Sequence, residues 1–164
     1  MNTTIKAQPV LVGALVMGVL SALPIIAVGN TCCCLWVVGG GFVAAYLQQQ
    51  MQNTPISPAD GALVGLLAGL GGAVVHLIIS VPINLMLGPL EREMMRRIVE
   101  NMAGAEGFRD YAGRADMIAG PIRAAIGFVF MLFLGAIFST IGGLIGAMVF
   151  RKDAPVPLDA PPAR

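Results

Sequence analysis

Three long stretches of this 164-residue chain contain almost no ionisable side chains. Asp, Glu, Lys, Arg and His are absent from residues 7–59 and 124–150, and His76 is the only one of them in residues 61–90. A helix needs roughly 20 apolar residues to cross the ~30 Å hydrocarbon core of a bilayer. Each stretch is long enough for one crossing, and the first is long enough for two. The sequence therefore predicts an all-α integral membrane protein, a bundle of about four transmembrane helices.

The composition also favours an apolar environment. Hydrophobic residues make up 57% of the chain and charged residues 12%, and the mean hydropathy is +0.82. Soluble domains carry about 25% charged residues, so this chain has too few to cover a solvated surface. The net charge is +1, and the basic residues form no patch that would favour nucleic acid. We therefore expect the lipid bilayer as a partner, and no nucleic acid.

Proline, glycine and polar residues mark where the helices begin and end. Gly29-Asn30 is favourable turn chemistry, and one helix through it would be about 60 Å long, so a hairpin is required. Pro58 is typical of the first turn of a helix, and Gly88-Pro89 is typical of a helix end. Four crossings place both chain termini on the same side of the membrane. The predicted transmembrane helices are residues 9–28, 32–47, 58–87 and 121–150.

A different pattern follows the third predicted helix. In residues 90–102 apolar side chains recur at helical spacing and charged side chains occupy the other positions, which predicts an amphipathic helix. This helix either lies at the membrane surface or packs on its own protein. Residues 1–152 are thus predicted to form one transmembrane domain, and the proline-rich residues 153–164 a disordered tail. The basic residues are too evenly divided between the two sides to fix the orientation of the bundle.

Small residues recur at every fourth position in two of the predicted helices. Residues four apart lie on one face of a helix, so each series makes a smooth groove. In lipid, helices associate through close backbone approach rather than through hydrophobicity, and small residues permit that approach. We interpret the two grooves as packing surfaces, used either within the bundle or in a homo-oligomer or larger membrane complex. The predicted helix-packing residues are Gly61, Gly65, Gly69 and Ala73 in the third helix, and Gly135, Ser139, Gly143 and Ala147 in the fourth.

Two short sequence matches suggest that the chain contains a repeat. The tetrapeptide at residues 13–16, Gly-Ala-Leu-Val, occurs again at residues 61–64, and each copy lies near the start of a predicted hairpin. Residues 38–40, Val-Gly-Gly, are similar to residues 141–143, Ile-Gly-Gly. Two similar hairpins side by side would be related by a pseudo-two-fold axis along the membrane normal. Because such matches also arise by chance in helices rich in Gly, Ala and Leu, the repeat is a hypothesis.

One polar stripe lies within the third predicted helix. His76 is the only histidine, and it shares a helix face with Ser80 and Asn84 at four-residue spacing. An ionisable residue inside a membrane is a functional candidate, so this face could line a permeation or transport path. The alternative is a structural role, in which a neighbouring hydroxyl or carbonyl group satisfies a neutral histidine.

Three consecutive cysteines, Cys32–Cys34, lie at the predicted tip of the first hairpin. A structural zinc ion needs four ligands, and adjacent cysteines form strained rings rather than ordinary disulfides. Small apolar packing is the interpretation we favour, with a metal, redox or intermolecular disulfide role as alternatives. The rest of the sequence presents no nucleophile–base pair, phosphate-binding loop or metal-ligand spacing. We therefore predict no enzyme activity, no cofactor and no bound metal.

Three segments, residues 13–41, 61–84 and 137–152, resemble a group of uncharacterised bacterial polytopic membrane proteins. The most distinctive part of the resemblance is the cysteine-rich turn followed by Leu35-Trp36. The resemblance implies a bacterial origin and a chain that crosses the membrane four times, and we expect this membrane to be the cytoplasmic (inner) one. It implies no activity, cofactor or catalytic residue.

These features favour a non-enzymatic membrane protein that acts through helix packing, as an accessory or scaffold subunit or as a homo-oligomer. A small permeation or transport protein that uses the His76–Ser80–Asn84 face is the second hypothesis. A metal or redox role at Cys32–Cys34 is the third. The sequence contains no information on a substrate.

Overall fold

The computed structural model describes residues 5–23, 26–30, 34–101 and 120–152, and within these ranges the chain is mainly helical and contains no strand. Three helices are α1 (Ala7–Ala22), α2 (Leu35–Gln50) and α3 (Pro58–Asn101). The fourth is continuous from Gly120 to Val149 and consists of α5 (Gly120–Leu134), the π-helical turn η2 (Gly135–Ser139) and α6 (Thr140–Val149). The prediction of an all-α chain with four helices is thus confirmed for the described residues.

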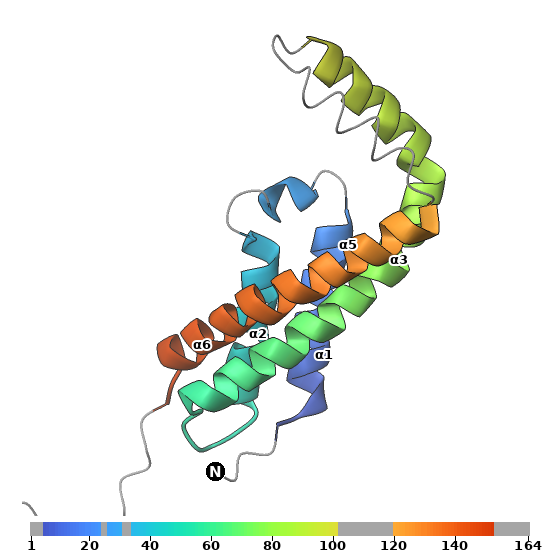
Figure 1. Ribbon diagram of the computed structural model, residues 1–164. Helices are drawn as coiled ribbons and strands as arrows, with labels where there is room; N and C mark the ends of the chain where they lie inside the picture. Colours follow the sequence, from blue (N-terminus) through green and yellow to red (C-terminus); the bar gives the residue numbers. More distant parts are fainter. Residues whose placement is uncertain (1–4, 24–25, 31–33, 102–119, 153–164) are drawn as a thin grey trace, which may run out of the picture.

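The helices form two antiparallel hairpins that pack side by side (Figure 1). α1 and α2 form the first hairpin, and α3 with α5–α6 forms the second. α1 packs on α2 and α3, and α6 also packs on α2 and α3. α1 and α3 run in the same direction, because Gly13 lies beside Ala68 and Gly18 lies beside Val75. The result is a four-helix core in which α2 and α3 touch across the diagonal.

The connection between α1 and α2 is longer than predicted. α1 ends at Ala22, whereas the sequence predicts a helix to residue 28. Leu23 has an extended backbone (φ −81°, ψ 121°), the conformation that a following proline imposes on the residue before it. The chain then makes a short 3₁₀ turn, η1 (Ile26–Asn30), and α2 begins at Leu35 rather than at residue 32. The predicted break at Gly29-Asn30 is therefore the end of a structured turn.

The third helix is also longer than predicted. The sequence predicts an end at Gly88-Pro89, but α3 continues through Pro82 and Pro89 to Asn101, so the predicted end is wrong. A proline removes one backbone hydrogen bond and bends a helix, and it does not have to end it. Figure 1 shows the last part of α3 turned away from the direction of its first part. The predicted amphipathic helix is thus the continuation of α3 rather than a separate element.

The start of α3 and both ends of the fourth helix agree with the sequence, whereas α1 begins at Ala7 rather than at residue 9 and α2 ends at Gln50 rather than at residue 47. α3 begins at Pro58, where the Ser57 hydroxyl accepts a hydrogen bond from the Asp60 amide (3.0 Å) and donates one to the Asp60 carboxylate (2.7 Å). The fourth helix, predicted at residues 121–150, begins and ends within one residue of that range. The predicted tail, residues 153–164, lies outside the described residues.

The interior of the core contains small side chains, and the large apolar side chains point outward. Most buried hydrophobic residues in the described ranges are alanines, accompanied by Met17, Val37, Ile56, Val64 and Met131. This distribution is the reverse of that in soluble domains, where large apolar side chains are buried. Exposed large apolar residues come from every long helix and include Leu11, Leu15, Leu35, Leu63, Leu67, Ile78, Ile126, Phe133, Ile141 and Met148.

Two helical segments are long and apolar enough to cross a membrane. They are Pro58–Leu90, with 33 residues, and Ala124–Val149, with 26 residues. At 1.5 Å per residue they are about 50 Å and about 39 Å long, more than the ~30 Å of a hydrocarbon core. α1 is a shorter apolar helix of 16 residues.

α3 and α5 extend beyond α1 and α2 at one end of the core (Figure 1). Gly18, near the end of α1, lies beside Val75 of α3. Because α3 extends to Asn101, it continues well past the last residue of α1. We call residues 77–101 of α3 and 120–130 of α5 the arm. Apolar side chains on the arm are strongly exposed, and Leu85 and Met86 reach 77% and 82%.

Candidate functional site

The two predicted series of small residues face each other between α3 and α5–α6. A Cβ atom on Gly61 would lie 2.7 Å from the Gly143 carbonyl oxygen, and one on Gly135 would lie 2.7 Å from the Gly69 carbonyl oxygen. A Cβ atom on Gly65 would lie 3.0 Å from the Gly143 Cα atom. These distances leave no room for a side chain, so glycine permits the close approach of the two backbones. The two grooves are therefore occupied within this chain.

Ser139 lies in the middle of this interface. Its side chain is fully buried, and its hydroxyl donates a hydrogen bond to the Gly65 carbonyl oxygen at 2.7 Å. The residue ends the π-helical turn η2, and a Cβ atom on Gly41 of α2 would overlap its carbonyl oxygen. Ala73 and Ala147, the last members of the two series, are also buried. Three helices thus meet at Ser139. The π-helical turn that ends there is a rare conformation, and those that do occur are frequently at functional sites.

Met17 fills the space between the two hairpins. It is completely buried, and Cβ atoms on Gly40, Gly72 and Gly135 would lie 2.7, 2.5 and 3.2 Å from its side chain. A flexible, unbranched side chain suits an irregular gap between small residues. The sequence carries no signal for this role, because the residues on either side of Met17, Val16 and Gly18, are also apolar.

Buried glutamines fix the α2–α3 connection at the end of the core opposite the arm. Gln48 and Gln49 are each 1% exposed. The Gln48 side-chain oxygen accepts a hydrogen bond from the Lys6 amide at 3.2 Å. The Gln49 side chain accepts one from the Ile56 amide at 2.7 Å and donates one to the Thr54 carbonyl oxygen at 3.2 Å. Such partners are required for buried amide groups, so these contacts hold the connection against α2.

Two lysines converge on the same connection. The Lys6 ammonium donates a hydrogen bond to the Met51 carbonyl oxygen at 2.6 Å, and the Lys152 ammonium donates one to the Gln52 carbonyl oxygen at 3.2 Å. Arg151, next to Lys152 in the sequence, is exposed. Both ends of the described chain therefore lie at the same end of the core, together with positive charge.

Asn30 and Trp36 close the other end of the first hairpin. The Asn30 side chain accepts a hydrogen bond from the Trp36 amide at 3.1 Å and donates one to the Ser21 hydroxyl at 2.9 Å. The Trp36 indole N–H donates to the Ile26 carbonyl oxygen at 2.6 Å, and Gly29 packs against the indole ring. Asn30 is thus more than the predicted turn residue, because its side chain ties the end of α1 to the start of α2.

The predicted polar face on α3 does not form one connected site. His76 is half-buried, and its Nδ1 atom is buried with no hydrogen-bond partner among the described residues. The Ser80 hydroxyl donates to the Leu77 carbonyl oxygen at 3.3 Å, and the exposed Asn84 side chain donates to the Ser80 carbonyl oxygen at 2.8 Å. These two polar groups are directed to the backbone of their own helix rather than to His76.

The cysteine cluster lies partly outside the described residues, which include Cys34 but not Cys32 and Cys33. Cys34 precedes α2 with a left-handed backbone (φ 51°, ψ 42°). It is half-buried and packs against the apolar cluster that contains Val37 and Met131. Within the part of the chain that the structure describes, no three His, Cys, Asp or Glu side chains are grouped closely enough to hold a metal ion.

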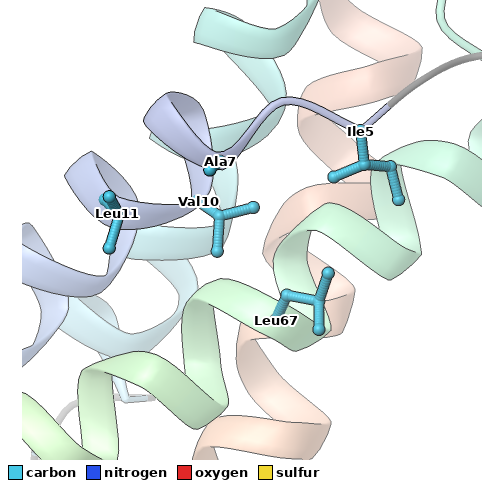
Figure 2. Close-up of a pocket in the computed structure, with 5 residues that line it drawn as sticks. All are labelled: Ile5, Ala7, Val10, Leu11 and Leu67. Carbon is cyan, nitrogen blue, oxygen red and sulfur yellow. The ribbon is translucent and has the colours of Figure 1, made fainter.

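A shallow apolar groove lies between the start of α1 and α3 (Figure 2). Its volume is about 440 Å³. The lining consists of Ile5, Ala7, Val10, Leu11 and Leu67. All five side chains are apolar, so the groove offers van der Waals contact and no group for acid–base or nucleophilic chemistry.

The sequence matches no protein-family model, and neither curated proteins nor solved structures show a significant match to it.

Proposed function

We propose that this chain is a bacterial integral membrane protein that crosses the cytoplasmic membrane with four helices. It acts without catalysis, as an accessory or scaffold subunit or as a homo-oligomer. The proposal is carried by the distribution of side-chain size, with small residues inside and large apolar residues on the outer faces. In water this arrangement forfeits about 25 cal/mol for each Å² of apolar surface left exposed. In lipid the exposed leucines are solvated, and the small residues allow close backbone packing.

The placement of charge supports the same environment. Lys6 and Lys152 lie at one end of the core, and the ion pair between Glu93 and Arg97 (3.0 Å) lies on the arm beyond the other end. An apolar layer separates these two regions, as expected for a protein with two polar boundaries. α1 is about 24 Å long, shorter than the ~30 Å hydrocarbon core, and local thinning of the bilayer accommodates it, whereas tilting accommodates the much longer α3.

The surfaces left for a partner follow from the packing. Because the small-residue grooves of α3 and α6 occupy each other, a partner subunit or second copy has to contact other faces. In the proposed role the glycine-packed core is the rigid part, and the outer faces and the arm contact lipid and partner helices. Phe130 and Leu85 on the arm are examples of such outward side chains.

Membrane fractionation tests this proposal with the full-length, tagged protein. We expect the protein to stay in the membrane pellet during an alkaline carbonate wash and to need detergent for extraction. Light scattering in detergent then separates a monomer, a homo-oligomer and a complex with another subunit. A folded, monodisperse protein in detergent-free buffer would refute the membrane assignment. A monomer without a copurifying subunit would refute the oligomer and accessory roles.

A second candidate function is a small permeation or transport protein. The observation that favours it is the buried Nδ1 atom of His76, which has no hydrogen-bond partner within the part of the chain that the structure describes. An imidazole in an apolar region of a membrane protein is a candidate for handling a proton or a polar ligand.

Proton flux into liposomes tests this second candidate. Vesicles with the purified protein, an imposed pH gradient and an enclosed pH-sensitive dye are compared with protein-free vesicles. We expect faster loss of the gradient with the wild type, no such acceleration with His76→Leu, and wild-type behaviour for the control Thr140→Ala, which lies outside the polar face and whose hydroxyl bonds to its own helix. Equal rates for the wild type and His76→Leu would eliminate the candidate.

A further inference from the structure

In the first hairpin, α1 and α2 approach each other through Gly13 and Gly40. A Cβ atom on Gly13 would lie 2.5 Å from the Gly40 carbonyl oxygen and 2.7 Å from the Ala44 Cβ atom. A Cβ atom on Gly40 would lie 2.8 Å from the Gly13 carbonyl oxygen and 3.4 Å from the Met17 amide nitrogen. The two helices are therefore in backbone contact, and one register between them is selected.

The second hairpin repeats this set of contacts. A Cβ atom on Gly61 would lie 2.7 Å from the Gly143 carbonyl oxygen and would overlap the Ala147 Cβ atom. A Cβ atom on Gly143 would overlap the Gly61 carbonyl oxygen and would lie 3.0 Å from the Gly65 amide nitrogen. The same four kinds of contact thus occur between α3 and α6 as between α1 and α2.

Two constant shifts relate the contacts of the two hairpins. A shift of 48 residues carries α1 onto α3, and a shift of 103 residues carries α2 onto α6. The same two shifts align the sequence matches, residues 13–16 with 61–64 and residues 38–40 with 141–143. The sequence matches and the interhelical contacts are separate observations, and both align the first hairpin with the second by the same two shifts. The equivalent residues are Gly13 and Gly61, Met17 and Gly65, Gly40 and Gly143, and Ala44 and Ala147.

We infer that this protein is a tandem duplication of one helical hairpin, and that the second copy contains an inserted element. In the first copy, residues 23–34 join the two helices, and the equivalent part of the second copy is residues 71–137. The insertion contains His76 and the whole arm. The duplicated hairpins build the core, and the features that distinguish this chain from a simple repeat are concentrated in the insertion.

Electron paramagnetic resonance tests the equivalence of the hairpins with exposed label sites, which leave the packed glycines intact. Spin labels go on the full-length, otherwise cysteine-free protein at Leu15→Cys with Tyr46→Cys, and at Leu63→Cys with Val149→Cys. All four positions are exposed, and the two pairs are related by the two shifts. We expect mean distances that agree within about 3 Å, half a helical turn.

A second pair of variants checks the register rather than the distance alone. Moving the first label one turn gives Leu11→Cys with Tyr46→Cys and, at the equivalent positions, Ala59→Cys with Val149→Cys. The change in mean distance should have the same sign and size in both hairpins. A difference of a full helical turn, about 5.4 Å, between the copies in either measurement would overturn the duplication. Dilution of the labelled protein with unlabelled, cysteine-free protein removes distances between subunits, so the result does not depend on oligomeric state and is distinguishable from failure of the proposed function.

Discussion

The glycines of this chain differ in how much space surrounds them. A Cβ atom on Gly65 would overlap the Ser139 carbonyl oxygen of the facing helix, whereas no atom of the described residues lies within 4 Å of a Cβ atom on Gly39 or Gly127. The overlap is with backbone, which cannot rotate away as a flexible side chain can. A glycine of the first kind is required by the packing, and a glycine of the second kind is replaceable.

Substitution at these two kinds of glycine should have very different effects. We expect Gly65→Val to lower the free energy of unfolding by about 3 kcal/mol, because the overpacked helices have to separate. We expect Gly127→Val to change it by less than about 0.5 kcal/mol, as at other open surface positions. Thermal or denaturant unfolding in detergent measures both. Similar losses for the two variants would show that α3 and α6 do not pack as described.

The Ser139 hydroxyl links two helices. Its contribution to the free energy of unfolding can be compared with that of a hydrogen bond within one helix. Ser139→Ala removes the bond to the Gly65 carbonyl oxygen and should lower the free energy of unfolding by about 1 kcal/mol. Thr140→Ala is the matched control, because the Thr140 hydroxyl bonds to the Ala136 carbonyl oxygen of its own helix. Unfolding of both variants in detergent should show the larger loss for Ser139→Ala, and the reverse order would contradict the interhelical role.

At the scale of helices, α3 shows a boundary that local chemistry predicts and a boundary that it does not. The start of α3 was predictable because Ser57 and Pro58 act on their immediate neighbours. Its end was not, because the fate of a helix at Pro89 depends on what the chain beyond it contacts. The candidate site likewise contains residues whose role the sequence predicts and residues whose role it does not. Four-residue periodicity predicts which small residues share a face, but the role of Met17 depends on contacts with distant segments, and that of Asn30 on how the chain folds back between α1 and α2.

The bend of α3 provides a test at this scale. Pro89→Ala restores a backbone donor in the helix interior, so we expect a straighter α3 and no loss of stability. Spin labels at Leu70→Cys and Asn101→Cys should move apart towards about 47 Å, the length of 31 residues of straight helix. Pro58→Ala, at the first turn of α3, is the control and should leave this distance unchanged. An unchanged distance in Pro89→Ala would place the cause of the bend elsewhere.

For the whole molecule, the arrangement of the ends determines the topology in a membrane. Lys6 and Lys152 donate hydrogen bonds to the adjacent residues Met51 and Gln52, so the two ends of the described chain lie at the same end of the core. The arm extends from the opposite end, and Asn101 is exposed at the end of α3 (Figure 1). If, as proposed, a bilayer surrounds the core, both ends of the described chain lie on one side of it and Asn101 lies on the other.

Labelling of single cysteines in a cysteine-free background tests this topology in intact and permeabilised cells. A membrane-impermeant thiol reagent should reach Lys6→Cys and Lys152→Cys under the same condition, because both positions lie on one side. It should reach Asn101→Cys under the opposite condition. Labelling all three from one side would mean that the chain does not span the bilayer with its core. Labelling Lys6→Cys and Lys152→Cys from different sides would mean that an odd number of segments crosses it.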